Sequence, residues 1–145
     1  MLDKARNKHN QLSLSLHSAC NAITRAYRST LDQFDITYPQ YLVLLALWHA
    51  DSVSVKELSH QTLLDSSTLT PLLKRLEAKD LITRSRRRDD ERVRVICLTR
   101  EGRALERSAS DVPINIRRRI GLSVQDEAEL QLYCQRITDR LATPK

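Results

Sequence analysis

Glycine and proline are scarce in this sequence, with 2 and 4 among 145 residues. Because both residues are favoured in tight turns, their scarcity argues against a many-stranded sandwich or barrel and favours long helices. No run approaches the ~20 consecutive apolar residues of a membrane span, and the first residues lack the apolar block of a signal peptide. We therefore expect a soluble cytoplasmic protein without a membrane partner.

The residue patterns of metal and cofactor sites are also missing. The three cysteines, Cys20, Cys97 and Cys134, are too far apart for a zinc site or a disulfide framework. The four histidines have no metal-ligand spacing, and the sequence contains no glycine-rich phosphate loop, Ser-His-Asp arrangement or paired-carboxylate context. The sequence thus predicts no metal, no cofactor and no enzymatic activity.

The sequence contains enough hydrophobic residues for one core, and it has an excess of positive charge. Hydrophobic residues make up 41% and charged residues 29%, so the chain can bury a core. The 24 Lys and Arg minus the 18 Asp and Glu give a net charge of +6. A basic domain of this size suggests an anionic partner, although charge alone does not identify one.

Helical periodicity dominates the first third of the chain. Apolar residues recur every three or four positions between about residues 7 and 31, which predicts one long helix with a buried stripe. The stripe is wide, so we expect this helix to contact more than its own domain. A second helix is predicted to open at Tyr38 and Pro39, since proline fits the first helical turn. Its segment 41–48 is almost wholly apolar, which predicts a helix buried on all sides.

Two shorter helices follow. The residues at 54–57 have the pattern of a capping box and start a helix that runs to about Thr62. After a two-residue turn, Asp65 is a suitable N-cap for a helix over about 66–79. Its leucines are expected to be buried and its lysines and arginines to face outward.

The pattern then changes to a charged ribbon. Segments 81–84 and 93–99 have alternating or β-branched character, which predicts two strands joined by the loop 85–92. From Arg84 to Arg94 there are six arginines and three acidic residues, a net charge of +3 in 11 residues. Two short helices followed at once by such a ribbon form the order of a winged helix-turn-helix.

The rest of the chain is predicted to be helical. Thr99 is expected to cap a helix over about 100–112, which Pro113 interrupts or kinks before a segment at 114–120. A capping pattern at 123–126 then opens a last helix that runs to about residue 141.

The helix at 66–79 is the candidate reader of DNA. Its first turn offers unpaired backbone N–H groups and small hydroxyls, which can approach phosphates and base edges closely. Lys74 and Arg75 can reach phosphate or guanine, and an arginine at the loop tip fits a narrow minor groove. Each feature alone also fits a capped helix or a solvated surface, but in this order they favour DNA binding.

Four motifs carry a resemblance to a known family. LLDSSTLTPLLKRLEA at 63–78, RRDDERVRV at 87–95 and LTREGR at 98–103 resemble the MarR family of winged-helix regulators. With TYPQYLVL at 37–44, the helix motif is similar to the branch of organic hydroperoxide resistance regulators. The resemblance implies a mainly α fold with a small β-wing (α+β), in which N- and C-terminal helices form the interface of a homodimer.

The resemblance also divides the chain. It implies a single domain over 1–145, with dimerisation helices at about 7–34 and 100–142 and a winged helix-turn-helix region at about 38–99. A two-fold dimer would read a pseudopalindromic operator in double-stranded DNA. The implied DNA-binding residues are Ser66, Ser67, Thr68, Thr70, Pro71, Lys74, Arg75, Arg86, Arg87, Arg88, Asp90 and Arg92.

Position 13 departs from the pattern of this branch. Its members sense peroxide through a cysteine near the start of the first helix, hydrogen-bonded by two tyrosines, which would be Tyr27 and Tyr38 here. This chain has Ser13 at that position and His17 where a third tyrosine is common. A thiolate is oxidised to sulfenate, whereas a serine hydroxyl forms no stable oxidised state.

Two explanations of Ser13 remain open. The serine either replaces a cysteine as a mimic of the reduced state, which the retained tyrosines favour, or reflects natural divergence toward another effector. Cys20 lies on the same helical stripe and could be a second thiol, although a cysteine there is more often inert core. Cys97 is expected to be buried. Cys134 could resolve an oxidised thiol, but a low-molecular-weight thiol is the favoured partner.

These observations predict a dimeric transcriptional repressor rather than an enzyme. With a cysteine at position 13, organic hydroperoxide would oxidise it and the dimer would release its operator. The main alternative is a repressor whose pocket near Ser13, Tyr27 and Tyr38 binds a small phenolic or apolar ligand. The sequence also leaves open a thiol peroxidase, against which the missing nucleophile argues, and an architectural DNA-binding protein without sequence preference.

Overall fold

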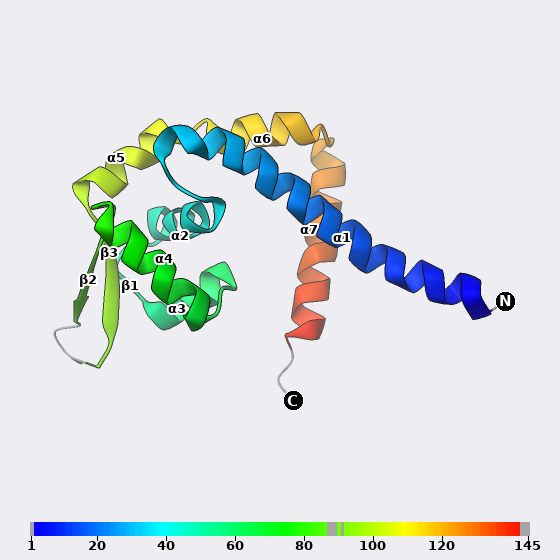
Figure 1. Ribbon diagram of the computed structural model, residues 1–145, viewed down its shortest axis with the longest axis horizontal. Helices are drawn as coiled ribbons and strands as arrows, with labels where there is room; N and C mark the ends of the chain where they lie inside the picture. Colours follow the sequence, from blue (N-terminus) through cyan, green and yellow to red (C-terminus); the bar gives the residue numbers. More distant parts are fainter. Residues whose placement is uncertain (1, 87–89, 91, 143–145) are drawn as a thin grey trace. The chain divides into compact units, whose positions relative to one another are not determined.

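The computed structural model describes residues 2–86, 90 and 92–142, with side chains from residue 11 onward. The chain forms two compact units, Met1–Val112 and Pro113–Lys145. The assignment of residues 1–145 to one domain stays a prediction. In chain order the elements are α1 (Leu2–Leu31), the 3-10 helix η1 (Asp32–Phe34), α2 (Tyr38–His49), β1 (Val53–Ser54), α3 (Val55–Thr62), α4 (Ser66–Ala78), β2 (Ile82–Arg86), β3 (Arg94–Leu98), α5 (Arg100–Ser108), α6 (Val112–Ile120) and α7 (Val124–Leu141) (Figure 1).

Side chains next to the helix starts determine where the short helices begin. The Ser54 N–H donates to the Glu57 carboxylate at 2.7 Å, and the Glu57 N–H donates to the Ser54 hydroxyl at 3.2 Å. This is the predicted capping box, which satisfies two helix-end donors at once. Thr37 and Gln40 form an equivalent box at the start of α2 that we did not identify in the sequence.

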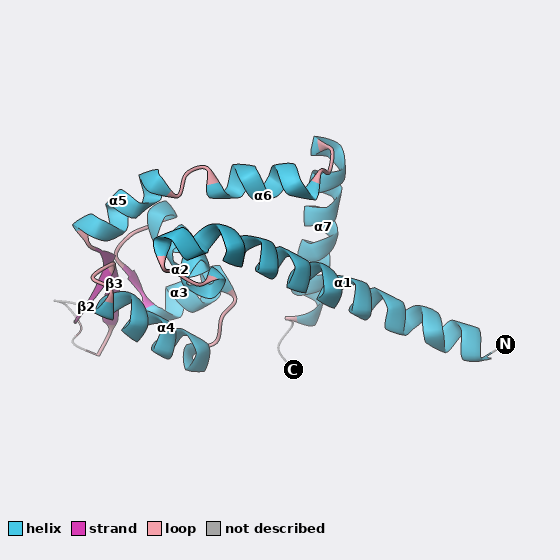
Figure 2. Ribbon diagram, turned by 45° about the horizontal axis from the view of Figure 1, so that its top comes forward, coloured by secondary structure: helices cyan, strands magenta, loops and turns pink. Residues whose placement is uncertain are grey.

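The strands form one small antiparallel sheet in the order β1-β3-β2. In Figure 2 they lie together beside α4 and α5. β2 and β3 pair along their whole length, and β1 places Ser54 opposite Val95. The sequence did not predict β1, because two residues are too few to show alternation.

A buried cluster connects the sheet to the helices of the first unit. It explains the leucine spacing of α4, since all four predicted leucines turn inward and are buried. The cluster includes Leu31, Ile36, Tyr41, Val43, Leu44, Leu47, Leu58, Leu69, Leu72, Leu73, Leu76, Ile82, Ile96, Leu98, Ala109 and Val112.

Three predictions about elements need correction. α2 is not buried on all sides, because Leu45 keeps 38% of its surface exposed and His49 is also exposed. The helix after Thr99 ends at Ser108 rather than at residue 112. Pro113 does not break that helix; it lies in the first turn of α6, where the missing N–H costs little.

Apolar side chains remain on the surface of each unit. On α1, Leu12 and Leu14 are 60% and 63% exposed, so the predicted stripe is not buried along its first half. On α7, no side chain is buried, and Leu132 and Tyr133 are about half exposed. Among the described helices, none combines the length and apolar character that crossing a membrane requires.

Candidate nucleic-acid interface and sensing site

The start of α4 presents small polar side chains to solvent. The Asp65 carboxylate caps the helix by accepting the Thr68 N–H at 2.7 Å, and it also accepts the Ser67 hydroxyl. These hydrogen bonds, with that of Ser67 the largest effect, lower the pKa of Asp65. The Thr70 hydroxyl donates to the Ser66 carbonyl at 2.8 Å. Because Ser67 and Thr70 use their protons within the helix, each offers hydrogen-bond acceptor lone pairs to a partner.

The rest of the outer face of α4 is basic. The buried leucines fix which side of the helix faces the core, so the opposite side faces solvent. Every predicted contact residue on α4 is exposed: Ser66, Ser67, Thr68, Thr70, Pro71, Lys74 and Arg75.

An ion pair connects the wing to α4. The Arg84 guanidinium on β2 donates from Nε to the Glu77 carboxylate at 2.7 Å and also from its Nη2. These hydrogen bonds hold the pKa of Glu77 below its usual value. The pair therefore orients the ribbon relative to the outer face of α4.

The structure describes part of the predicted wing site. Arg86, Asp90 and Arg92 are exposed, whereas Arg87 and Arg88 lie outside the described residues. We expected Asp90 to orient Arg92. The contact observed is between the Asp90 carboxylate and the backbone N–H of Arg92, at 3.0 Å, so Asp90 shapes the turn of the chain.

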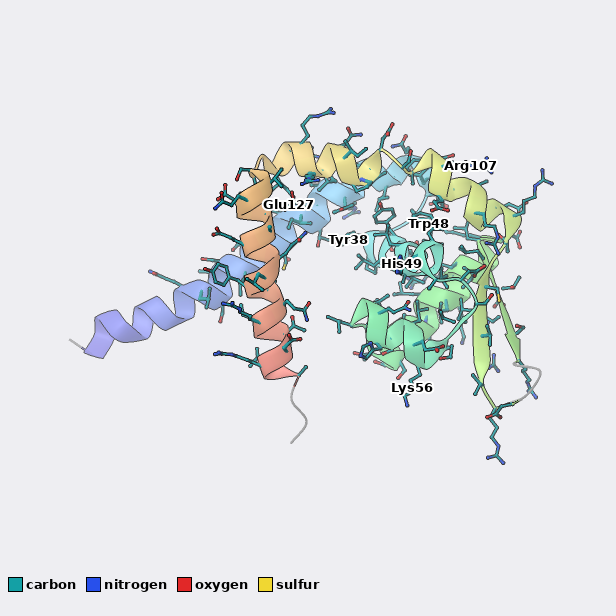
Figure 3. The ribbon with its side chains drawn as sticks, turned by 180° about the vertical axis from the view of Figure 1, so that it is seen from behind. Tyr38, Trp48, His49, Lys56, Arg107 and Glu127 are labelled. Carbon is teal, nitrogen blue, oxygen red and sulfur yellow. The ribbon has the colours of Figure 1, made fainter. Side chains whose placement is uncertain are left out.

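Tyr27 and Tyr38 form an aromatic cluster in the first unit. Their rings stack with centroids 4.4 Å apart. The centroid of the Tyr41 ring lies 5.6 Å from that of Tyr27, and the centroid of the Trp48 ring lies 5.9 Å from that of Tyr41 (Tyr38 and Trp48 are labelled in Figure 3). The Trp48 indole N–H donates to the Gly102 carbonyl at 2.9 Å. Burial, followed by the charge of neighbouring groups, raises the pKa of Tyr27 and Tyr38 above the usual value and that of Tyr41 to about 12. The tyrosines are therefore protonated hydrogen-bond donors at neutral pH.

Ser13 does not join this cluster within one chain. It is exposed and precedes Tyr27 by 14 residues on the continuous helix α1, a separation of about 21 Å at 1.5 Å per residue. We expected Ser13 beside the tyrosines, and a single copy does not bring them together. His17 also lies apart, with its Nε2 3.0 Å from the Asn21 amide nitrogen.

Cys20 interacts electrostatically with Tyr38. After burial, this interaction is the second cause of the raised pKa of Tyr38. Cys20 is exposed rather than packed in a core, as is Cys134 on α7. We expected Cys97 to be buried, but it is only half-buried, and its thiol lies 3.4 Å from the Ser52 hydroxyl.

Sequence reasoning missed a basic groove between α3 and the wing. Lys56 and His60 line it from α3, and Arg94 lines it together with the predicted Arg92. The signal was present, because Lys56 and His60 are four residues apart on a short helix and so share one face.

Comparison with known proteins agrees with this geometry. The family model described as transcriptional regulator SarA/Rot matches residues 25–107. The organic hydroperoxide resistance transcriptional regulator of Bacillus subtilis is 45% identical over 122 residues, which cover 84% of this chain and 81% of that protein. The HTH-type transcriptional regulator SarZ of Staphylococcus saprophyticus is 34% identical over 140 residues, covering 97% of this chain and 96% of that protein.

Solved structures show the same fold. Reduced AbfR bound to DNA is 29% identical, with a TM-score of 0.84 over 99% of this chain and 100% of that chain. A MarR mutant from E. coli complexed with operator DNA is 25% identical, with a TM-score of 0.82 over 90% of this chain and 96% of that chain. The predicted MarR-like winged-helix fold is confirmed, as is the resemblance to organic hydroperoxide resistance regulators. The chain belongs to the SarA/Rot family of winged-helix transcriptional regulators, which are MarR-like in fold.

Proposed function

We propose that this regulator is a homodimeric repressor that binds a pseudopalindromic operator in double-stranded DNA. α4 enters the major groove, and arginines of the wing, Arg92 foremost, reach the minor groove. The observation that carries the proposal is the division of α4 into a fully buried leucine side and an outer side of hydroxyls and cations. The solved complexes of AbfR and of MarR with DNA support the same partner.

Exposed apolar residues support a second copy of the chain as the other partner. Soluble monomers rarely leave large contiguous apolar patches in water. On α1 the exposed leucines are Leu12 and Leu14, and on α7 the exposed apolar residues are Val124, Leu130, Leu132, Tyr133 and Leu141. A dimer interface built from the terminal helices would cover both faces.

A dimer would also bring position 13 close to the tyrosines, from which α1 separates it within one chain. If two α1 helices pair with opposite direction, position 13 of one copy approaches Tyr27 and Tyr38 of the other. There the tyrosine hydroxyls can donate hydrogen bonds to the group at position 13, since both remain protonated at neutral pH. Position 13 and the two tyrosines are thus the proposed sensing site.

The chemistry of this site requires a thiol. A thiolate attacks the terminal oxygen of an organic hydroperoxide, the O–O bond breaks, and the alkoxide leaves and takes up a proton as the alcohol. The resulting sulfenic acid condenses with a low-molecular-weight thiol to a mixed disulfide and releases water. Ser13 undergoes neither step, so the chain with this serine corresponds to the reduced, operator-binding state.

A second candidate function follows from the aromatic cluster itself. Tyr27, Tyr38, Tyr41 and Trp48 offer rings and phenolic hydroxyls without any redox step. A small phenolic or apolar ligand that binds there would release the operator in a chain that keeps Ser13. Release of DNA by such a ligand, with no response of any variant to hydroperoxide, would favour this candidate.

The test is to restore the thiol. Ser13→Cys should lose operator binding when cumene hydroperoxide is added, whereas the chain with Ser13 should keep it, as measured by fluorescence anisotropy of a labelled duplex. Cys20→Ser in each background is the matched control. Release by the Ser13 chain that disappears with Cys20→Ser would assign sensing to Cys20 instead. Continuous consumption of hydroperoxide by Ser13→Cys would mean a thiol peroxidase rather than a stoichiometric sensor.

A further inference from the structure

Trp48 joins the end of α2 to the start of α5. Its indole N–H, in the last turn of α2, donates to the Gly102 carbonyl in the first turn of α5 at 2.9 Å. Its ring also lies edge-on to Tyr41, with the centroids 5.9 Å apart (Trp48 is labelled in Figure 3). Trp48 therefore connects the aromatic cluster, which consists of Tyr27, Tyr38, Tyr41 and Trp48 itself, to α5.

Gly102 lies against the base of the wing. A Cβ atom at this position would come 2.1 Å from the Leu81 carbonyl oxygen, so glycine is what allows α5 to approach the chain so closely here. Leu81 directly precedes β2, and its carbonyl accepts the N–H of Thr99, which directly follows β3, at 3.1 Å. The Thr99 hydroxyl in turn accepts the Gly102 N–H at 3.0 Å. Gly102 thus contacts the place where β2 begins and β3 ends.

Asp51 makes a second connection to the same place. One carboxylate oxygen accepts the Leu98 N–H at the end of β3 at 2.9 Å, and the other accepts the Arg103 guanidinium at 2.5 Å. Asp51 follows α2 by two residues, and Arg103 is next to Gly102 on α5. The end of α2 and the first turn of α5 therefore hold the base of the wing together.

The orientation of the base controls the position of the far end of the wing. From Leu98 to Arg94, β3 is about 14 Å long at about 3.4 Å per residue. A rotation of about 8° at Leu98 would therefore move the Arg94 end by about 2 Å. A shift of this size breaks a hydrogen bond of about 3 Å to DNA. Contacts at the base of the wing can thus determine whether Arg92, beyond the end of β3, reaches DNA.

We propose that Trp48 is a positioning residue for the wing, and that it connects the tyrosines of the proposed sensing site to the contact of the wing with DNA. Ring contacts lead from Tyr27 and Tyr38 through Tyr41 to Trp48, and the hydrogen bond to Gly102 leads on to the base of the wing. All of these residues belong to the first unit. The inference rests on the proposed DNA-binding function, and it applies whether hydroperoxide or a phenolic ligand acts at the tyrosines.

Removal of the indole N–H tests the positioning role. Trp48→Phe keeps an aromatic ring against Tyr41 but loses the donor to Gly102. We expect it to weaken binding of a duplex that the wild-type protein selects from a random pool by about two- to tenfold, the range that one hydrogen bond contributes. Because this loss acts through the wing, Trp48→Phe should cause a smaller fold-loss in an Arg92→Ala background than in the wild type. Fluorescence anisotropy of the labelled duplex measures both.

Tyr41→Phe is the matched control. This variant keeps the ring against Trp48 and leaves the hydrogen bond to Gly102 in place, so it should bind the selected duplex like the wild type. Circular dichroism and urea unfolding of each variant establish that it is folded under the conditions of the assay.

The fluorescence of Trp48 gives an independent measurement, since the chain contains a single tryptophan. Coupling between two sites is reciprocal, so contact of the wing with DNA must also change the surroundings of Trp48. We expect the emission maximum of the wild type to shift when the selected duplex binds, and the shift to be smaller in Arg92→Ala at saturating duplex. A residue that only stabilised the fold would show no such response.

The outcomes separate this inference from the proposed function. Wild-type binding by Trp48→Phe, or the same fold-loss with and without Arg92, would show that Trp48 does not position the wing. An emission spectrum that stays unchanged while anisotropy shows binding would also contradict the inference. In each of these cases the proposed function stands. If the wild-type protein selects no duplex, the proposed function itself fails, and this inference fails with it.

Discussion

Asp65 is the residue that defines the start of the proposed recognition helix. Its carboxylate accepts the Thr68 N–H and the Ser67 hydroxyl, so both of these groups are fixed in the first turn of α4. The sequence already predicted this N-cap, because the preference for aspartate at such a position depends on groups only three residues away. Helix caps of this kind, which depend only on neighbouring residues, can therefore be predicted from the sequence.

The cap should give the protein a measurable pH dependence. The hydrogen bonds lower the pKa of Asp65 in the folded state, so its contribution to stability is complete above the unfolded value of 3.8 and is lost as the pH falls through the lower folded value. Asp65→Asn keeps a capping oxygen without the titration. Urea unfolding across this acid range should therefore show a shallower fall of stability for Asp65→Asn than for the wild type.

Asp80→Asn serves as the matched control, since Asp80 is an exposed aspartate beyond the C-terminal end of α4. This variant should keep the wild-type fall of stability in acid. An equal pH dependence in the wild type and Asp65→Asn would show that the cap carries no such charge effect.

At the scale of elements, the orientation of the wing depends on contacts between segments that are distant in sequence. Arg84 on β2 binds Glu77 on α4, and the carboxylate of Asp51 accepts the Leu98 N–H at the end of β3 at 2.9 Å. Neither pair could be predicted from spacing alone. The same limit explains why the exposure of Leu45 and the end of α5 at Ser108 were missed, since tertiary packing decides both.

The Arg84–Glu77 pair should matter for DNA through the wing. Glu77→Gln removes the charge that holds Arg84, so the wing loses its fixed orientation and Arg92 loses the position from which we propose that it reaches the minor groove. We expect Glu77→Gln and Arg92→Ala each to weaken duplex binding. The double variant should lose less binding free energy than the sum of the losses in the two single variants. Anisotropy titrations of the four proteins measure this cycle.

Glu106→Gln on α5 makes the same chemical change at an exposed site away from the wing and should bind like the wild type. Strictly additive losses in the double variant would mean that Glu77 does not act through the wing.

For the whole molecule, the proposed sensing site illustrates what a sequence cannot supply. The motif identifies Ser13, Tyr27 and Tyr38, but the rise of α1 separates Ser13 from Tyr27 by about 21 Å in one chain. Only an assembly of two copies can unite them, and periodicity within one sequence does not give its geometry. The exposed leucines of α1 are the feature of the single chain that supports the proposed dimer.

The most direct test of the proposed repressor is sedimentation of the wild-type protein at moderate salt with two duplexes. One is a duplex that the protein selects from a random pool, and the other is the same duplex with scrambled sequence. We expect two copies of the chain per duplex and a clear preference for the selected sequence. Arg75→Ala should reduce that preference by about 1–3 kcal/mol per half-site, as expected for loss of a bidentate contact to guanine. A monomer in solution, or equal binding of both duplexes by the wild type, would contradict the proposed function.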